Sequence, residues 1–140
     1  WDATVEAWMA PNTPPSISKG VSSVTMLGGF WQLDAFKSEF MGMPFEGMGT
    51  LAYDNVQKQY ISTWVDNMGT GIMVATGACD ANGPSWTMKG DMADPMSGKM
   101  VPTRSVTKIV DADHMVMEMY VAGPDGKEMK MMEIAATRTK

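Results

Sequence analysis

The chain has few of the residues that build disulfide frameworks, metal centres or basic surfaces. Its 140 residues include one cysteine, Cys79, and one histidine, His114. An internal disulfide is therefore excluded, and so is a structural zinc site with four Cys or His ligands. The 11 Lys and Arg residues are scattered among 16 Asp and Glu residues, which gives a formal net charge of −5. This acidic balance argues against nucleic acid as a partner.

Long apolar runs and helical periodicity are lacking as well. No stretch approaches the length of about 20 apolar residues that a transmembrane helix needs, so no transmembrane segment is expected. No window keeps apolar residues at i, i+3, i+4 and i+7, which argues against helices. The composition, 44% hydrophobic and 19% charged, suits a soluble globular protein with a single domain over residues 1–140. The compartment stays open between cytoplasm and periplasm.

The sequence does have a strong period-two alternation, interrupted by turn residues every eight to twelve positions. This pattern predicts an all-β protein of about ten antiparallel strands. A meander of that length removes its edge strands most simply by closing into an up-and-down barrel. The expected strands are residues 1–9, 18–27, 30–40, 49–54, 58–66, 71–80, 84–93, 100–111, 114–122 and 127–138.

The stretch MGMPFEGMG, residues 41–49, is expected to connect two of these strands. Pro44 cannot donate a hydrogen bond to a sheet, and three glycines surround it. We therefore predict a loop at the mouth of the barrel, with Phe45 placed to cover a cavity.

Methionine accounts for 17 residues, and thioethers are ligands of copper(I). Met115, Met117 and Met119 alternate along one strand and should share a face. In the next strand, strict alternation would put Met129 and Met131 on one face and Met132 on the other. Packing of the barrel by adaptable side chains explains these methionines better than a copper site that includes His114. Cys79, near the end of a strand, is expected to be a buried and inert thiol.

Residues 41–71 resemble the central block of an uncharacterised bacterial family, domain of unknown function 1579. The family pattern is a GG-x-W or GG-x-F turn, then M-G-x-P-F-E-G-x-G, Y-D-N and K-x-Y-x-S-x-W-x-D. Residues 28–31, 41–49, 53–55 and 58–66 match these elements, and the resemblance continues through residues 94–100, 118–120, 126–134 and 137–138. At the start, only Trp1 remains of the usual Gly-x-Trp element.

The resemblance implies a lipocalin-like (calycin-like) barrel with an internal pocket, similar to the haem-binding nitrobindins. It implies no catalytic activity. A haem would need His114 as its axial ligand, and a histidine beside the DAD turn (residues 111–113) is more typical of a solvated loop. We therefore expect no metal and no cofactor.

We interpret the protein as a non-catalytic binding protein that holds a small, mostly apolar ligand in the barrel. Polar residues in mid-strand would anchor the ligand, and aromatic residues would line the cavity. The alternative for these polar residues is a set of cross-strand pairs on the outer surface. The predicted binding residues are Trp31, Phe36, Phe45, Trp64, Trp86, Arg104, Glu118, Tyr120 and Glu133.

Two further functions stay open. Several strands carry apolar residues on both faces, so a homodimer or a larger protein complex could cover the outside of the barrel, with the chain as a structural or accessory subunit. In an enzyme acting on a small hydrophobic substrate, Glu118 or Glu133 would serve as a general acid or base of raised pKa.

Overall fold

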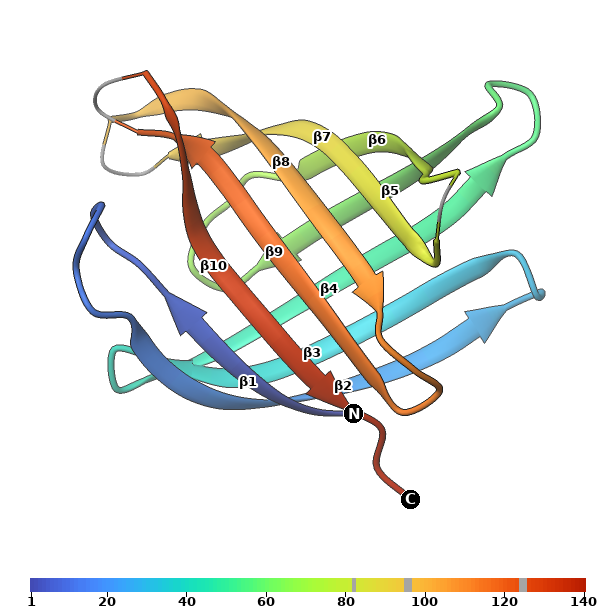
Figure 1. The fold of residues 1–140 in the computed structure, drawn as a ribbon, viewed down its shortest axis with the longest axis horizontal. Coiled ribbons are helices and arrows are strands. Elements are labelled where there is room, and N and C mark those ends of the chain that lie inside the picture. The colour runs from blue at the N-terminus through green and yellow to red at the C-terminus, as the bar shows by residue number, and fades with distance from the viewer. Residues whose placement is uncertain (82, 95–96, 124–125) are drawn as a thin grey trace.

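The computed structural model describes residues 1–81, 83–94, 97–123 and 126–140, which form strands, turns and loops without a helix (Figure 1). The described residues therefore contain no helix that is long and apolar enough to cross a membrane. The turns expected at 81–83, 94–98 and 123–126 lie partly outside the described residues. The strands are β1 (Asp2–Ala7), β2 (Ser16–Leu27), β3 (Trp31–Phe40), β4 (Met43–Asp54), β5 (Gln59–Asp66), β6 (Met73–Cys79), β7 (Ser85–Asp94), β8 (Lys99–Ile109), β9 (His114–Ala122) and β10 (Glu128–Thr137).

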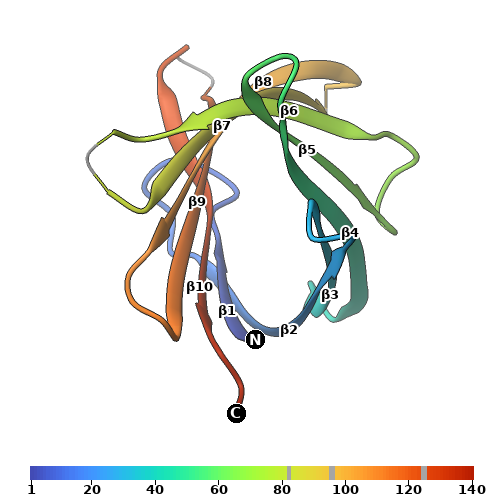
Figure 2. The same ribbon diagram turned by 90° about the vertical axis from the view of Figure 1, so that its right-hand side faces the viewer.

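The ten strands form one closed antiparallel barrel. Each strand pairs with its neighbour in sequence, and β1 closes the barrel by pairing with β10, from Asp2 opposite Thr137 to Ala7 opposite Met132. The two chain ends consequently lie at the same end of the barrel (Figures 1 and 2). The predicted fold class, an all-β up-and-down barrel of about ten strands, is confirmed, and it is consistent with the lipocalin-like expectation.

The loop predicted at residues 41–49 is wrong for most of its length. Only Met41 and Gly42, with φ of 51° and 78°, form the turn, and β4 already begins at Met43. Pro44 is tolerated because the pairing of β4 with β5 starts at Gly47, so no strand on that side needs its missing N–H. The Pro44 carbonyl instead accepts a hydrogen bond from Nδ2 of Asn67 at 3.0 Å.

Alternation divides every strand between an inner and an outer face, and the burial of side chains identifies the inner one. Phe36 of β3 packs in one cluster with Ala3 of β1 and Ala136 of β10, which requires all three to point into the barrel. The register then assigns the other strands to the same two faces. The least exposed inner residues are Ala3, Ser22, Phe36, Ala75, Met88, Thr103 and Ala136.

A β-bulge in β10 changes which residues of that strand face inward. Lys130 pairs with Tyr120 and Met132 pairs with Met119, so Met131 is an extra residue between them. Beyond a bulge the alternation changes phase. The expectation that Met129 and Met132 point to different faces is therefore wrong. Met129 pairs with Val121 and Met132 pairs with Met119, so both lie on the inner face.

Candidate functional site

Three aromatic side chains dominate one wall of the lumen. The ring centroid of Phe36 lies 6.2 Å from that of Phe45 and 6.5 Å from that of Trp64. Phe45 therefore belongs to the inner packing beside Phe36. Nε1 of Trp64 donates a hydrogen bond to Oδ2 of Asp66 at 3.0 Å, which satisfies the polar end of the indole.

Glycines in the barrel wall make room for these rings. A Cβ atom at Gly47 would lie 2.2 Å from Cζ2 of Trp64, and one at Gly49 would lie 3.1 Å from Cε3 of the same ring. On the other side, a Cβ at Gly20 would lie 2.5 Å from Cζ of Phe36. The two rings therefore lie directly against backbone, which only glycine permits at such short range.

Four of the nine predicted binding residues face the lumen. Phe36, Phe45 and Trp64 form the aromatic wall, and Trp86 has the inner orientation because it precedes the buried Met88 by two positions in β7. The other five, Trp31, Arg104, Glu118, Tyr120 and Glu133, have registers that place them on the outer face. Their predicted position in the lumen is wrong. Apolar residues on both faces of the strands had hidden which face is buried.

Arg104, Glu118, Tyr120 and Glu133 instead build a charged network across β8, β9 and β10. Arg104 donates two hydrogen bonds to Glu128, at 2.8 and 2.7 Å, and its guanidinium lies 4.2 Å from the ring centre of Tyr120. The Tyr120 hydroxyl donates to Glu118 at 2.9 Å. The network is the cross-strand surface arrangement that the sequence had left as an alternative.

Lys130 completes this network by pairing with both Glu118 and Glu133. The hydrogen bond with Glu133 and that with Glu118 raise the pKa of Lys130, against the opposing effect of burial. The hydrogen bond from Lys130 likewise lowers the pKa of Glu118. A general acid or base of raised pKa needs the opposite shift, so Glu118 does not fit that role.

The lumen contains polar residues that the predicted set omitted. Asp34 lies at mid-strand in β3, and its Oδ1 accepts a hydrogen bond of 2.6 Å from the buried hydroxyl of Ser22 in β2. Gln32 has the same orientation as Asp34, and Thr103 donates to the Gly90 carbonyl at 3.0 Å. The sequence contained a signal for Gln32 and Asp34, because both lie at even steps of two from Phe36 in β3 and therefore on the same face.

Methionines contribute much of the remaining inner wall. Met115, Met117 and Met119 share the inner face of β9, which confirms that the three lie on one face. Met119 lies directly opposite Met132 of β10, and Met88 of β7 is only 4% exposed. Thioethers of this kind offer a soft and adaptable surface to a ligand.

Tyrosines and Cys79 lie at the lumen end where β4, β6 and β8 finish. The rings of Tyr53 and Tyr60 lie 5.1 Å apart, edge to face. A hydrogen bond between Tyr60 and Cys79 raises the pKa of Tyr60. Cys79 is exposed, so the expectation of a buried thiol is wrong. It is the last residue of β6, where the strand meets solvent at the turn.

The lumen is not filled by its own side chains. No large side chain among the described residues is fully buried, and inner residues at mid-strand, such as Leu51, Ser62 and Met117, stay partly exposed. The accessible surface is 9047 Å². A compact protein of 15.2 kDa would expose about 7,100 Å². The protein therefore exposes roughly 1,900 Å² more than this scaling gives, and the partly exposed inner residues contribute to that surface.

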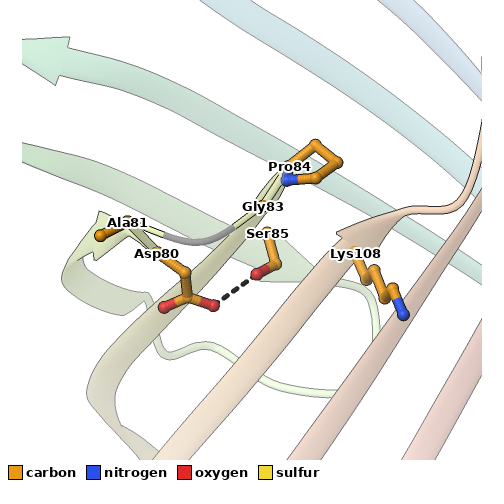
Figure 3. A pocket seen from close by; sticks show the side chains of 6 residues that line it. All are labelled: Asp80, Ala81, Gly83, Pro84, Ser85 and Lys108. Carbon is orange, nitrogen blue, oxygen red and sulfur yellow. Dashed lines mark hydrogen bonds between the residues drawn. The ribbon is translucent and has the colours of Figure 1, made fainter.

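Two hollows lie beside turns of the chain. One, of about 540 Å³, is bordered by the β6–β7 turn and Lys108, and Ser85 donates a hydrogen bond to Asp80 across it (Figure 3). Ser85 and Lys108 are register partners on the outer face, so this hollow faces outward. The second, of about 340 Å³, lies beside Trp8 and Lys130. Neither hollow contains a predicted binding residue.

The described residues include no group of three His, Cys, Asp or Glu side chains placed to hold a metal ion. His114 lies on the outer side, at the start of β9, with Nδ1 2.8 Å from Oδ1 of Asp111. Its imidazole therefore points at a turn carboxylate and not into the lumen where a haem would lie.

Comparison with known proteins gives a family but no activity. No curated protein matches the chain. The model of a family described as "Protein of unknown function (DUF1579)" matches residues 1–138, nearly the whole chain. The chain therefore belongs to this family, as its GG-F-W, M-G-M-P-F-E-G-M-G and Y-D-N elements led us to expect.

Proposed function

We propose that this protein binds a small, mostly apolar ligand in the lumen of its barrel. One observation carries the proposal: inward-facing residues at mid-strand, such as Leu51, Ser62 and Met117, stay partly exposed inside the closed barrel. A barrel that served only as a rigid scaffold would be expected to fill its interior with side chains. Aromatic rings and thioethers beside a few polar groups are the usual lining of a ligand site.

The test compares two tryptophan substitutions at neighbouring positions of β8. Thr107 faces inward, opposite Trp86 and Met117, whereas Val106 faces outward, opposite Thr87 and Glu118. We expect Nile red, a neutral apolar dye, to bind the wild-type protein saturably with enhanced fluorescence. Thr107→Trp should weaken this binding about ten-fold or more by filling the lumen, and Val106→Trp should leave it unchanged.

Two outcomes contradict the proposal. One is the absence of saturable dye binding to the wild-type protein. The other is equal binding by the wild type and by a folded Thr107→Trp variant. Native mass spectrometry of untreated protein gives an independent readout, because a retained ligand would raise the mass above 15.2 kDa.

A second candidate function, as a subunit of a protein assembly, is favoured by the outer face of β2–β5. This apolar face consists of three register rows of four residues, none of them charged. The rows are Leu27–Trp31–Ala52–Ile61, Thr25–Leu33–Thr50–Thr63 and Ser23–Ala35–Met48–Val65. Leu27, Trp31, Met48 and Val65 are the exposed large hydrophobic residues in these rows.

A second copy of the chain suits this apolar face. Two chains with a net charge of −5 each repel one another, and they approach most easily through a surface without charges. Face-to-face packing of two such sheets is a common arrangement. Light scattering would then report a mass of about twice 15.2 kDa, and a strictly monomeric protein would contradict this function.

A further inference from the structure

The charges inside the barrel are sparse and almost all of one sign. Among the residues of the ten strands, inward-facing carboxylates occur at Asp34, Asp66 and Asp94. Among the same strand residues, the only inward-facing base is Lys99, which lies at the rim as the register partner of Asp94. Asp66 ends β5 and accepts hydrogen bonds from Trp64 and from the backbone of Met68. Asp34 is thus the one charged residue at mid-strand on the inner wall.

Only one of the two carboxylate oxygens of Asp34 accepts a hydrogen bond from the described part of the chain. Its Oδ1 accepts the 2.6 Å hydrogen bond from Ser22, whose hydroxyl belongs to a residue that is 5% exposed. Its Oδ2 accepts no hydrogen bond from the described part of the chain, and no Lys, Arg or His there forms an ion pair with Asp34. The residues outside the described part are Asn82, Pro95, Met96, Pro124 and Asp125, none of which is basic.

Aromatic rings flank this carboxylate. The register partner of Asp34 in β4 is Gly49, and the indole of Trp64 lies against Gly49. Phe36 follows two positions along β3 on the same face. A carboxylate among aromatic residues is the chemistry that recognises an ammonium group, by a charge-assisted hydrogen bond and by cation–π attraction.

We propose that Asp34 anchors the ammonium group of an amphipathic amine whose apolar body occupies the lumen. The proposal rests on the ligand-binding function and specifies its ligand class. The wall that surrounds the anchor, with Trp64, Phe36 and Leu51, receives the apolar body. An anionic ligand finds no base at mid-strand to pair with, and the carboxylate repels it.

The experiment uses three ten-carbon probes that differ only in their polar end: decylamine, which is cationic at neutral pH, decanol and decanoate. Isothermal titration calorimetry measures their dissociation constants with the wild-type protein at low ionic strength. Decylamine should bind about ten-fold more tightly than decanol, the factor expected of one charge-assisted hydrogen bond, and decanoate should bind most weakly.

Substitution of the anchor separates charge from shape. Asp34→Asn keeps an oxygen that accepts the Ser22 hydrogen bond, and circular dichroism checks that the variant folds. It should bind decylamine and decanol with equal affinity. Glu39→Gln removes a carboxylate from the outer face of the same strand and should keep the wild-type preference.

The outcomes distinguish this inference from the function on which it rests. Binding of decanol with no preference for decylamine overturns the anchor and leaves lumen binding in place. Tighter binding of decanoate, or an unchanged preference in Asp34→Asn, also overturns the anchor alone. Failure of all three probes and of Nile red overturns both.

Discussion

At the scale of single residues, the glycines of β4 are explained by the ring that lies on them. A Cβ at Gly47 would approach three ring atoms of Trp64 within 2.9 Å. The ring has little freedom to move, because its Nε1 donates a hydrogen bond to Asp66 and the ring of Phe36 lies next to it. Glycine destabilises a strand by about 0.5–1 kcal/mol relative to alanine. The close packing of the Trp64 ring on these glycines must therefore stabilise the fold by more than that.

We predict that Gly47→Ala lowers the free energy of unfolding by about 1–3 kcal/mol, the usual cost of overpacking. Gly49→Ala is the graded control, since its Cβ would lie 3.1 Å from the ring and the ring needs to shift only slightly. Alanine loses less conformational entropy on folding than glycine, and this stabilisation should largely offset the cost of moving the ring. Urea unfolding followed by tryptophan fluorescence measures both. Equal effects of the two substitutions would contradict the packing explanation.

The same residues show where prediction from sequence succeeded and failed. Phe36, Trp64 and Trp86 were expected to line the lumen, and they face it. The stretch around Pro44 was expected to be a loop, because glycine and proline ordinarily weaken a strand. Gly47 and Gly49 have another role, which depends on a tryptophan about 15 residues later and leaves no local signal.

At the scale of strands, strict alternation predicts faces only as far as the first irregularity. The extra residue Met131 in β10 reverses the phase, so Lys130 and Glu133 share the outer face although their numbers differ in parity. Alternation also gives two faces without saying which is buried. Glu118 and Arg104 were placed in the lumen for that reason, whereas the structure pairs them with Lys130 and Glu128 outside.

The network on β8–β10 should make stability depend on pH in the acid range. The Lys130 hydrogen bond lowers the pKa of Glu118 from its usual 4.5 in the folded state. Folding therefore gains stability from Glu118 above pH 4.5, and the gain is lost as the pH falls through the lowered pKa. Glu118 is about one-third exposed, so solvent screening limits the gain to about 1 kcal/mol or less.

We predict that Glu118→Gln is less stable than wild type by up to about 1 kcal/mol at neutral pH, with a difference that shrinks as the pH falls below the usual pKa of 4.5. Urea unfolding at a series of pH values measures this. Asp2→Asn is the control, because it removes an exposed acid without an ion-pair partner in the described chain. The stability difference between Asp2→Asn and wild type should not depend on pH in this way. A constant offset between Glu118→Gln and wild type at all pH values would contradict the assigned pairing.

At the scale of the whole molecule, turn spacing and alternation predicted the number of strands and the closed barrel. Closure follows because ten consecutive antiparallel strands would otherwise leave two open edges. The open interior depends on side-chain volumes across the lumen. The small inner residues Ala3, Ala75 and Ala136 come from distant segments of the chain, so their combined effect could not be read from any one stretch.

The apolar face of β2–β5 leads to a prediction about assembly. If a second copy covers it, the wild-type protein should be a dimer of about twice 15.2 kDa in sedimentation or light scattering at about 50 μM, a concentration at which even micromolar affinity suffices. Met48, 63% exposed in the row between Ala35 and Val65, lies within this face.

Met48→Lys would bury an unpaired charge in the interface, which costs several kcal/mol, and each 1.4 kcal/mol weakens association about ten-fold. This variant should therefore be monomeric at the same concentration. Met100→Lys is the matched control, because Met100 is 59% exposed on β8, away from the apolar face, and the variant should remain dimeric. Loss of the dimer in both variants would point to a general effect of charge. A dimer that survives Met48→Lys would place the interface elsewhere on the barrel.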